Sequence, residues 1–238
     1  EALFRTSQRS GGVLRSLGRT VGEFCAELHG GAANRESLAS RFANRGVQNV
    51  RHAVQYLQVT QMLGRYARTH SLTPPTPGEQ AATEETGHHF RQASTCLTMG
   101  DGWPRSFLLD WTSRRLGVID WEFAHYGSPA QDSAHLLAHF WMIYRSLGAP
   151  EAIRQCAQVI AETYDSLLPE KAKRSWKEES RYLYLHGGCE IAMRLAGPYA
   201  EGYLLERAGE TVGREAYEKA RQLLSAGQSS RSSRENWE

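Results

Sequence analysis

One short stretch in the middle of this chain has the pattern of a β-hairpin, and that pattern limits the folds available to the rest of the chain. An apolar run at 107–109 and a second at 116–119 are joined by the polar segment WTSRR, as expected of two short strands and their turn. No other stretch of the sequence gives a convincing strand signal. We therefore expect a mainly α domain that carries one small hairpin.

Helical patterns fill most of the remaining sequence. Apolar residues recur three and four positions apart, which is typical of helices with one buried face. Two segments open with residues that favour a helix start, Thr76 with Glu79 and Ser128 with Gln131, each around a proline that suits the first turn. The expected helices cover residues 12–29, 47–66, 77–92, 128–143, 150–168, 169–195 and 212–226.

Composition sets the size of the domain. Hydrophobic residues make up 40% of the 238 positions, which is enough to fill one core. The short polar joints between the expected helices favour a single domain at residues 1–226. The final segment, GQSSRSSRENWE, lacks apolar periodicity, and we expect residues 227–238 to be disordered.

Charge and cysteine content narrow the classes of partner and compartment. Lys and Arg number 28 against 26 Asp and Glu, a formal net charge of +2, which is too balanced for an electrostatic hold on nucleic acid or a membrane surface. No apolar run approaches the roughly 20 residues that span a bilayer. The four cysteines are widely spaced and form no CxxC pair. We expect a cytoplasmic protein whose partner is a small molecule.

Two aspartates lie at the ends of the predicted hairpin. Asp101 precedes its first strand and Asp120 follows its second, so antiparallel pairing of the strands brings the two segments side by side. Two neighbouring carboxylates repel each other unless a cation or a proton lies between them, which favours a divalent metal site or an acid/base pair. The alternative is structural: Asp101 and Gly102 form a turn, and Asp120 caps the next segment.

Three motifs, in order, make the chain resemble a known family. Residues 99–109 read MGDGWPRSFLL, residues 118–122 read VIDWE, and residues 127–136 read GSPAQDSAHL. This series is similar to the motifs of the aminoglycoside phosphotransferase and choline kinase group, especially its fungal members, whose fold is that of the protein kinases. The earlier segment LGRTVGEFCAELH resembles the helix that precedes the catalytic segment in that family.

The resemblance implies a function and roles for individual residues. It implies transfer of the γ-phosphoryl group of ATP to a hydroxyl group of a small molecule, with Asp101 accepting the hydroxyl proton and Asp120 holding Mg²⁺ against the nucleotide phosphates. Such a reaction depends on positioning and charge neutralisation more than on covalent chemistry by the protein. Asp132 would be a buried structural acid that braces the catalytic loop through backbone amides.

The chain departs from the family pattern at the second metal ligand. Ser106 stands where the family has asparagine, and Arg105 replaces the small residue before it. A serine hydroxyl can ligate Mg²⁺. Arg105 can hold a phosphate or another anion, oppose the metal, or simply be an exposed arginine that points to water. The resemblance leaves Ser106 as a candidate metal ligand, and both residues as candidate contacts of the cofactor. Met99 replaces the family's histidine, a change that concerns loop packing.

In the resembling family, the helices after the hairpin form the wall of the acceptor site. The candidates for contact with the substrate are Trp103, Glu122, Tyr184 and Tyr199. His135 and His139, four positions apart on one predicted helix, have the spacing of a metal-chelating pair. The apolar residues around them favour a helix face that packs on the core instead.

The resemblance covers most of residues 12–226 and only the C-terminal lobe of a kinase-like fold. The glycine-rich loop and strand lysine of an N-terminal β lobe have no counterpart in residues 1–11, so we expect that lobe to be absent from this sequence. Either the chain is part of a larger kinase, or it is a shortened relative. A shortened relative is either an ATP-independent enzyme of specialised metabolism with Asp101 as general acid/base, or a pseudokinase that serves as a binding module.

Overall fold

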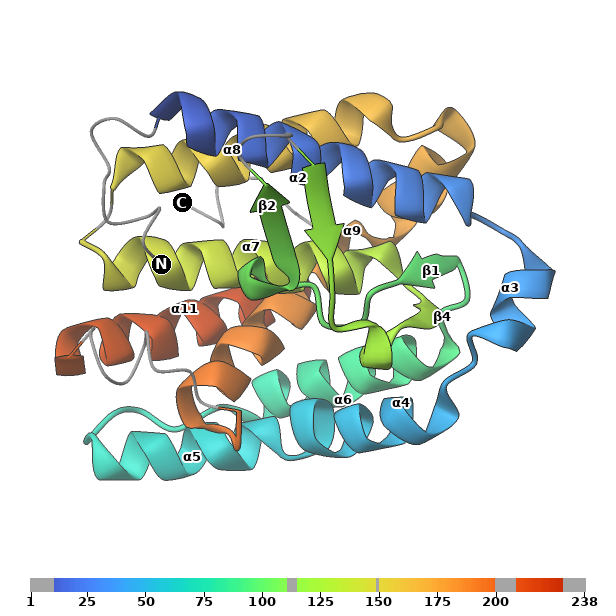
Figure 1. The fold of residues 1–238 in the computed structure, drawn as a ribbon. Helices are drawn as coiled ribbons and strands as arrows, with labels where there is room; N and C mark the ends of the chain where they lie inside the picture. Colours follow the sequence, from blue (N-terminus) through green and yellow to red (C-terminus); the bar gives the residue numbers. More distant parts are fainter. Residues whose placement is uncertain (1–10, 111–114, 149, 200–208, 229–238) are drawn as a thin grey trace.

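The computed structural model describes residues 11–110, 115–148, 150–199 and 209–228, and its architecture is mainly α, as expected (Figure 1). The helices are α2 (Gly11–Gly31), α3 (Glu36–Arg41), α4 (Arg45–Arg51), α5 (Val59–Thr69), α6 (Pro77–Gln92), α7 (Pro129–Ser146), α8 (Glu151–Leu167), α9 (Glu170–Ala196) and α11 (Gly209–Gln228). Of the predicted disordered tail, residues 227 and 228 end α11, and residues 229–238 lie outside the described part of the chain.

The long helices are arranged around α7 (Figure 1). Helix α7 packs against both α8 and α9, and α11 packs along α9. Helix α2 lies along α8 at one edge of the bundle, while α4, α5 and α6 form the opposite edge. The chain therefore has helices on two sides of its central segment, which contains the predicted hairpin.

Of the three buried apolar clusters in the described residues, the two larger ones hold the long helices together. The larger one lies between α5, α6, α7, α9 and α11. The second lies between α2, α7 and α8, and Phe107 and Leu116 of the hairpin pack against it. Burial of apolar surface is the main stabilising contribution in such a fold, and here it also fixes the inner face of the hairpin to the bundle.

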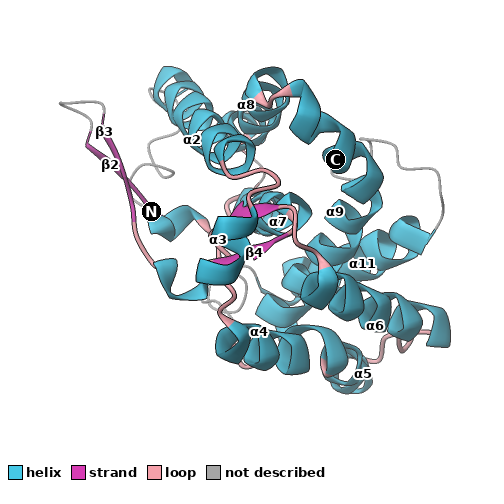
Figure 2. Cartoon of the chain, turned by 90° about the vertical axis from the view of Figure 1, so that its right-hand side faces the viewer, coloured by secondary structure: helices cyan, strands magenta, loops and turns pink. Residues whose placement is uncertain are grey.

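The predicted hairpin is confirmed. Strands β2 (Phe107–Asp110) and β3 (Arg115–Val118) pair antiparallel, with Leu108 opposite Gly117. Side chains alternate between the two faces of a strand, and Leu108, on the outer face, is 53% exposed. Ile119, just beyond β3, is 41% exposed. Figure 2 shows the hairpin at one edge of the molecule.

A second strand pair corrects the expectation that the hairpin is the only one. Strand β1 (Cys96–Thr98) pairs antiparallel with β4 (His125–Gly127). Each strand has three residues, too few to give an alternating pattern that sequence alone could reveal. The pair lies between the helices in Figure 2, and it ties the segment before β2 to the segment after β3.

The helix expected at 47–66 is interrupted by a π-helical turn, η1 (His52–Leu57), between α4 and α5. Such turns often occur at functional positions. Gln55 and Tyr56, adjacent in η1, are both buried and both bond to α9: Gln55 to Glu190 at 2.8 Å, and the Tyr56 hydroxyl to His186 at 2.8 Å. The turn therefore directs two consecutive polar side chains into the core.

One of the two predicted capping boxes is present. At the start of α6, Thr76 accepts from the backbone N–H of Glu79, and the Glu79 carboxylate accepts from the backbone N–H of Thr76. At the start of α7, Ser128 accepts from Ala130, but the second box is wrong because the Gln131 amide does not bond back to Ser128. It points into the protein, where it donates to the carbonyl oxygen of residue 100 at 3.2 Å.

Among the described helices, none is long and apolar enough to cross a membrane. The four cysteines, in the described part of the chain, are free thiols, three of them buried.

Candidate functional site

Asp101 and Asp120 lie in two loops that face each other between the strand pairs. At one end the loops meet at the β1–β4 pair. At the other end, the backbone N–H of Ile119 donates to the carbonyl oxygen of Ser106 at 3.0 Å. Both loops are therefore held at both ends, as the hairpin argument requires.

The two loops touch at Gly100. Its φ of +74° is in the region that favours glycine, and a side chain there would collide with the carbonyl oxygen of Phe123. Asp101 follows Gly100, and Phe123 belongs to the 3-10 turn η3 (Trp121–Phe123), which begins directly after Asp120. This close approach explains the glycine of the motif and brings the two aspartate-bearing loops into contact.

Asp120 has an unusual backbone and an unpartnered carboxylate. Its φ and ψ of 65° and 49° are left-handed, and its side chain does not cap η3. No hydrogen bond or ion pair joins its carboxylate to the described residues. Left-handed angles are uncommon for residues with a side chain, although asparagine and aspartate adopt them more readily than most, so the fold holds Asp120 in an uncommon conformation without using its carboxylate. The suggestion that Asp120 is only a cap is wrong.

Ser106 is hydrogen-bonded to the residue that precedes Asp120. It ends the 3-10 turn η2 (Pro104–Ser106), and its backbone bonds to Ile119, the residue before Asp120. Its side chain is fully buried, and its hydroxyl oxygen has no hydrogen-bond partner within the described part of the chain. A buried unpartnered hydroxyl is costly, and a ligand at this position would remove that cost.

Asp101 is held by two arginines. Its Oδ1 lies 3.0 Å from a guanidinium nitrogen of Arg51, which ends α4, and 3.3 Å from one of Arg194, on α9. The Asp101 side chain is 17% exposed. Its other oxygen, Oδ2, has no partner among the described residues, so one carboxylate oxygen is left for an outside group.

Asp132, near the start of α7, is 5% exposed and holds the loop that carries Asp101. It accepts from the backbone N–H groups of Met99 at 2.6 Å and Gly100 at 2.8 Å, and it lies 3.2 Å from Nε2 of His29. Burial would raise the pKa of this carboxyl group, but the hydrogen bonds from His29 and the two amides outweigh burial and lower it. Asp132 is therefore charged and fixed.

Asn44 holds the other loop. It precedes α4, and its side-chain amide donates to the carbonyl oxygens of Glu122 and Ala124, each at 2.9 Å. At the other end of α4, the Arg51 guanidinium lies over the Phe123 ring, 4.7 Å from its centroid. Both ends of this short helix therefore support the loop that contains Asp120.

The sequence profile of the phosphotransferase enzyme family matches residues 4–169, more than half of the chain. The chain belongs to the phosphotransferase enzyme family. This is the aminoglycoside phosphotransferase and choline kinase-like family that the motifs resemble, and the fold agrees with the mainly α C-terminal lobe of its kinase-like architecture. No curated protein matches the chain.

Kinases of this family use ATP and Mg²⁺, and the oxygen donors beside the hairpin suit that ion. Mg²⁺ prefers hard oxygen ligands such as carboxylates, hydroxyls and water. The unpartnered carboxylate of Asp120 and the buried, unpartnered hydroxyl of Ser106 are such donors. The residues present therefore fit a magnesium ion on the Asp120 side of the site.

Arg105 and Trp103 lie on the Asp101 side of the site. The exposed Arg105 has its guanidinium 5.3 Å from the Trp103 ring. Arg194 lies 5.6 Å from the same ring, and the ring is 5.7 Å from His139. Trp103 therefore lies beside Asp101, the candidate base, where a substrate contact was expected. The Arg105 guanidinium lies against the Trp103 ring.

The other substrate candidates do not converge on this place. Glu122 is exposed, and its backbone rather than its carboxylate takes part in the loop contacts. Tyr184 is 4% exposed and belongs to the larger apolar cluster. Packing in the core therefore accounts for this side chain, and a place in the wall of a substrate site does not. Tyr199 is 49% exposed beyond the end of α9.

Sequence reasoning missed the residues beneath Asp101. Glu190, on α9, is 1% exposed and bonds to Arg194, Gln55 and His139 at 2.7, 2.8 and 3.0 Å. Burial would raise the pKa of this carboxyl group, but the nearby Arg194 and the two histidines of α7 hold it well below its usual value. The sequence does contain one sign of this pair, because Glu190 precedes Arg194 by four positions in an apolar stretch of a helix. A charged side chain is rarely buried there without a partner of opposite charge.

Asp101, His135 and Glu190 each offer one ligand atom within 4.8 Å of the others. This group includes one histidine of the pair considered as a metal chelator. Arg51 and Arg194 already balance the charge of the two carboxylates, and a divalent ion would add surplus positive charge at a buried place. We therefore assign these side chains to a hydrogen-bonded network.

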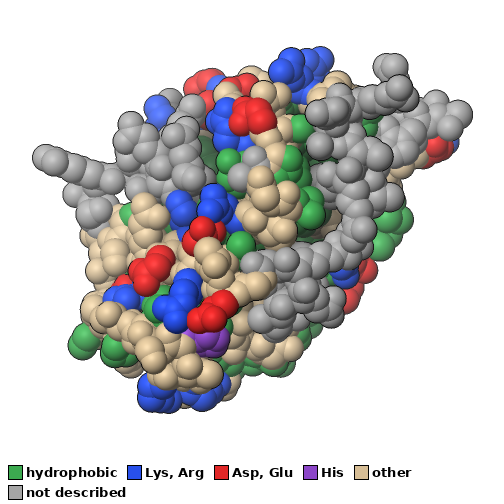
Figure 3. Space-filling view, turned by 90° about the vertical axis from the view of Figure 1, so that its left-hand side faces the viewer, with side chains coloured by type: hydrophobic (Ala, Val, Ile, Leu, Met, Phe, Trp, Pro, Cys, Tyr) green, Lys and Arg blue, Asp and Glu red, His purple; other side chains and the backbone are tan. Residues whose placement is uncertain are grey.

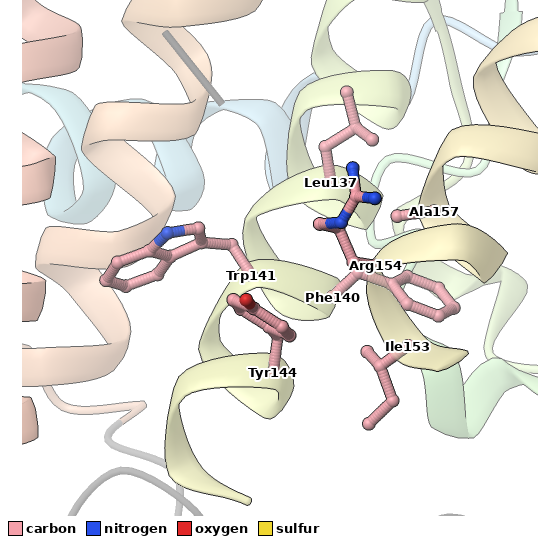
Figure 4. Close-up of a pocket in the computed structure, with 7 residues that line it drawn as sticks. All are labelled: Leu137, Phe140, Trp141, Tyr144, Ile153, Arg154 and Ala157. Carbon is pink, nitrogen blue, oxygen red and sulfur yellow. The ribbon is translucent and has the colours of Figure 1, made fainter. Parts of the chain in front are cut away.

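A small cavity of about 70 Å³ lies between α7 and α8 (Figure 4). Its lining is mostly apolar apart from Arg154, and it includes none of the motif residues. The lining residues are Leu137, Phe140, Trp141, Tyr144, Ile153, Arg154 and Ala157. It is too small for a nucleotide and separate from the two facing loops.

Proposed function

We propose that this protein transfers the γ-phosphoryl group of ATP to a hydroxyl group of a small molecule. Asp120 and Ser106 would hold Mg²⁺, which would neutralise charge on the nucleotide phosphates. Asp101 would accept the proton of the attacking hydroxyl. We further propose that the protein acts in the cytoplasm.

The state of Asp120 carries this proposal. Its carboxylate has no partner among the described residues and its backbone angles are uncommon, so the side chain adds nothing to the fold, as is expected where a ligand uses it. The buried hydroxyl of Ser106, also unpartnered, lies on the adjoining strand end. The backbone bond from Ile119 to Ser106 joins the segments that carry these two side chains, and a cation bound by both would offset both costs.

The outer face of the hairpin supports binding of the nucleotide base. Leu108 and Ile119 are exposed there, and Gly117, opposite Leu108, adds no side chain. This apolar surface is next to Asp120, so a flat base resting on it would place its phosphates near the proposed metal ligands. Apolar residues without cover favour contact with an apolar partner.

The oxygens of Asp101 support its role as base. Both arginines contact Oδ1, and Oδ2 is left for a hydroxyl group. The surface supports a small-molecule partner, because acidic and basic side chains are interspersed on the described part of the face in Figure 3. A partner such as nucleic acid favours a field of one sign.

The proposal is tested by thermal denaturation with ATP and Mg²⁺. A ligand that binds only the folded state raises its melting temperature, so millimolar Mg·ATP should raise it in the natural protein and a chelator should remove the rise. Asp120→Ala should abolish the shift, whereas Asp165→Ala, at an exposed position of α8, should keep it. No shift at millimolar Mg·ATP would contradict nucleotide binding by this chain.

Release of labelled phosphate from ATP, with water in place of the unidentified acceptor, tests the chemical step. Asp101→Asn should keep the Mg·ATP shift and lower phosphoryl transfer about 10²- to 10⁴-fold, the usual contribution of a positioned base. An ATP-independent enzyme would ignore Mg²⁺ and nucleotide and still need Asp101. A pseudokinase that serves as a binding module would still bind its partner with either Asp101→Asn or Asp120→Ala.

A further inference from the structure

Five side chains beneath the two loops form a closed ring that includes Asp101. Arg51 contacts Asp101 at 3.0 Å and donates to Oε1 of Gln55 at 2.8 Å. Nε2 of Gln55 donates to Glu190 at 2.8 Å. Nε of Arg194 donates to the other oxygen of Glu190 at 2.7 Å, and a second nitrogen of Arg194 reaches Asp101 at 3.3 Å. The ring therefore returns to the carboxylate where it started.

The ring is buried and balanced in charge. The side chains of Glu190, Arg194 and Arg51 are 1%, 8% and 10% exposed. Two carboxylates meet two guanidinium groups, and the Gln55 amide joins the halves by donating on one side and accepting on the other. Buried charges are tolerated when they are paired and hydrogen-bonded in this way.

Residues distant in the sequence make the ring possible. Arg51 ends α4, Gln55 lies in the π-helical turn η1, and Glu190 and Arg194 are one turn apart on α9. His135 and His139 of α7 also face the Glu190 carboxylate, at 3.5 and 3.0 Å. Glu190 is thus held from three helical elements, while Asp101 is held from two.

The ring controls which oxygen of Asp101 can act. Both guanidinium groups meet Oδ1, so the carboxylate has one occupied oxygen and one available oxygen. Arg51 also lies over the aromatic side chain of Phe123 in the opposite loop. The ring of five side chains therefore contacts both loops. A reacting group has to be held within fractions of an ångström to be effective, and a carboxylate on a loop needs such support.

We propose that Glu190, Gln55, Arg51 and Arg194 position Asp101 for proton transfer, with Glu190 as the most deeply buried member of the ring. This inference rests on the proposed function, because it concerns the residue that would act as base there. In a variant that is folded under the assay conditions, a ring that only stabilised the fold would leave both turnover and nucleotide affinity unchanged. A positioning ring influences turnover while nucleotide affinity is kept.

The test uses the full chain, with Mg·ATP as the probe and water as the phosphoryl acceptor. Phosphate release at saturating Mg·ATP and the Kd for Mg·ATP are measured for the natural protein, for Glu190→Gln and for Glu85→Gln. Glu85 pairs with Arg181 of α9 in a half-exposed ion pair outside the ring, so the control removes the same charge from another arginine of the same helix. We expect Glu190→Gln to lower turnover tenfold to a hundredfold with Kd within twofold, and the control to change neither.

Gln55→Met is the second variant, because it opens the ring without changing its charge and decides the matter if Glu190→Gln does not fold. It should show the same loss of turnover with Kd unchanged. If the folded variants keep turnover within twofold of the natural protein, the ring does not position Asp101, although the proposed function stands. The same conclusion follows if turnover and nucleotide affinity fall together. Absence of both binding and phosphate release in the natural protein would instead overturn the proposed function, and the ring's role with it.

Discussion

At the scale of single residues, Asp120 and Asp132 have opposite environments although both belong to the motif series. Asp120 has left-handed backbone angles and a carboxylate without a partner among the described residues. Asp132 is buried, and its carboxylate takes part in three hydrogen bonds. The fold therefore gains no stability from the Asp120 carboxylate, whereas the hydrogen bonds of the Asp132 carboxylate stabilise it.

The same substitution at both positions should therefore give different stabilities. Asp132→Asn places an amide N–H₂ against buried donors, and it should lower the free energy of unfolding by about 2–4 kcal/mol. Asp120→Asn should change it by no more than about 0.5 kcal/mol, because asparagine tolerates left-handed angles and no contact is lost. Urea denaturation measures both. A loss of equal size at Asp120 would show that its carboxylate supports the fold.

How far single residues could be predicted depended on whether their partners are near in sequence. The motifs singled out Asp101, Asp120 and Asp132 because their spacing follows from one hairpin and one helix start. The bond between Glu190 and Gln55 joins residues 135 positions apart, and a single sequence contains no signal for such a pair. Tyr184 was placed in a substrate wall because aromatic content alone does not separate a pocket from a core.

At the scale of elements, the packing of α2 on α8 depends on two glycines. A side chain at Gly18 would lie 2.7 Å from the backbone oxygen of Cys156, and one at Gly22 would lie 2.8 Å from that of Ile160. Helices approach so closely only where no side chain intervenes. Helix α2 also carries His29, the partner of Asp132, so this contact positions a support of the loop that contains Asp101.

Gly18→Ala should separate the two helices. It should lower the free energy of unfolding by about 1–3 kcal/mol, since an added methyl group in a close-packed contact forces a backbone shift. Gly12→Ala is the matched control, because nothing lies within 4 Å of that position, and it should be neutral or stabilising by up to about 1 kcal/mol. Equal effects of the two substitutions in urea denaturation would contradict the close-contact explanation.

The elements that could be predicted are those with enough residues to show a period. Helix α6 begins and ends where its capping residues and periodicity indicated, and the hairpin was found from two short apolar runs. The strands β1 and β4 are too short to show a period. The π-helical turn between α4 and α5 depends on partners in α9 that the local sequence does not contain.

At the scale of the whole molecule, buried histidines make stability depend on pH. Burial lowers the pKa of His135 to about 4 and that of His89 to about 4, and it holds the pKa of His186 well below its usual value. The unfolded chain has a histidine pKa near 6.5, so between these values it binds more protons than the folded protein. Stability is therefore complete above about pH 6.5 and is lost as the pH falls toward 4.

The free energy of unfolding, measured by urea denaturation at several pH values, should fall steeply between pH 6.5 and pH 4. Each fully buried histidine adds a slope of at most about 1.4 kcal/mol per pH unit. His89→Gln should make the slope shallower, because it removes one group that binds a proton only on unfolding. A stability that is constant over this range would contradict the buried, uncharged state of these side chains.

For the molecule as a whole, the mainly α architecture followed from periodicity, and the family followed from the order of three motifs. The contact between the loop that contains Asp101 and the loop that contains Asp120 could be predicted from the sequence only in part. A hairpin predicts that its ends are close, but the contact at Gly100 and the support from α4 depend on how the whole bundle packs.

The most direct test of a metal and nucleotide site at the hairpin is a crystal structure with Mn²⁺ and a non-hydrolysable ATP analogue, in which anomalous scattering locates the ion. We predict an ion in contact with the Asp120 carboxylate and the Ser106 hydroxyl, with the nucleotide phosphates beside it. An ion among Asp101, His135 and Glu190 instead, or crystals that contain neither ion nor nucleotide, would contradict it.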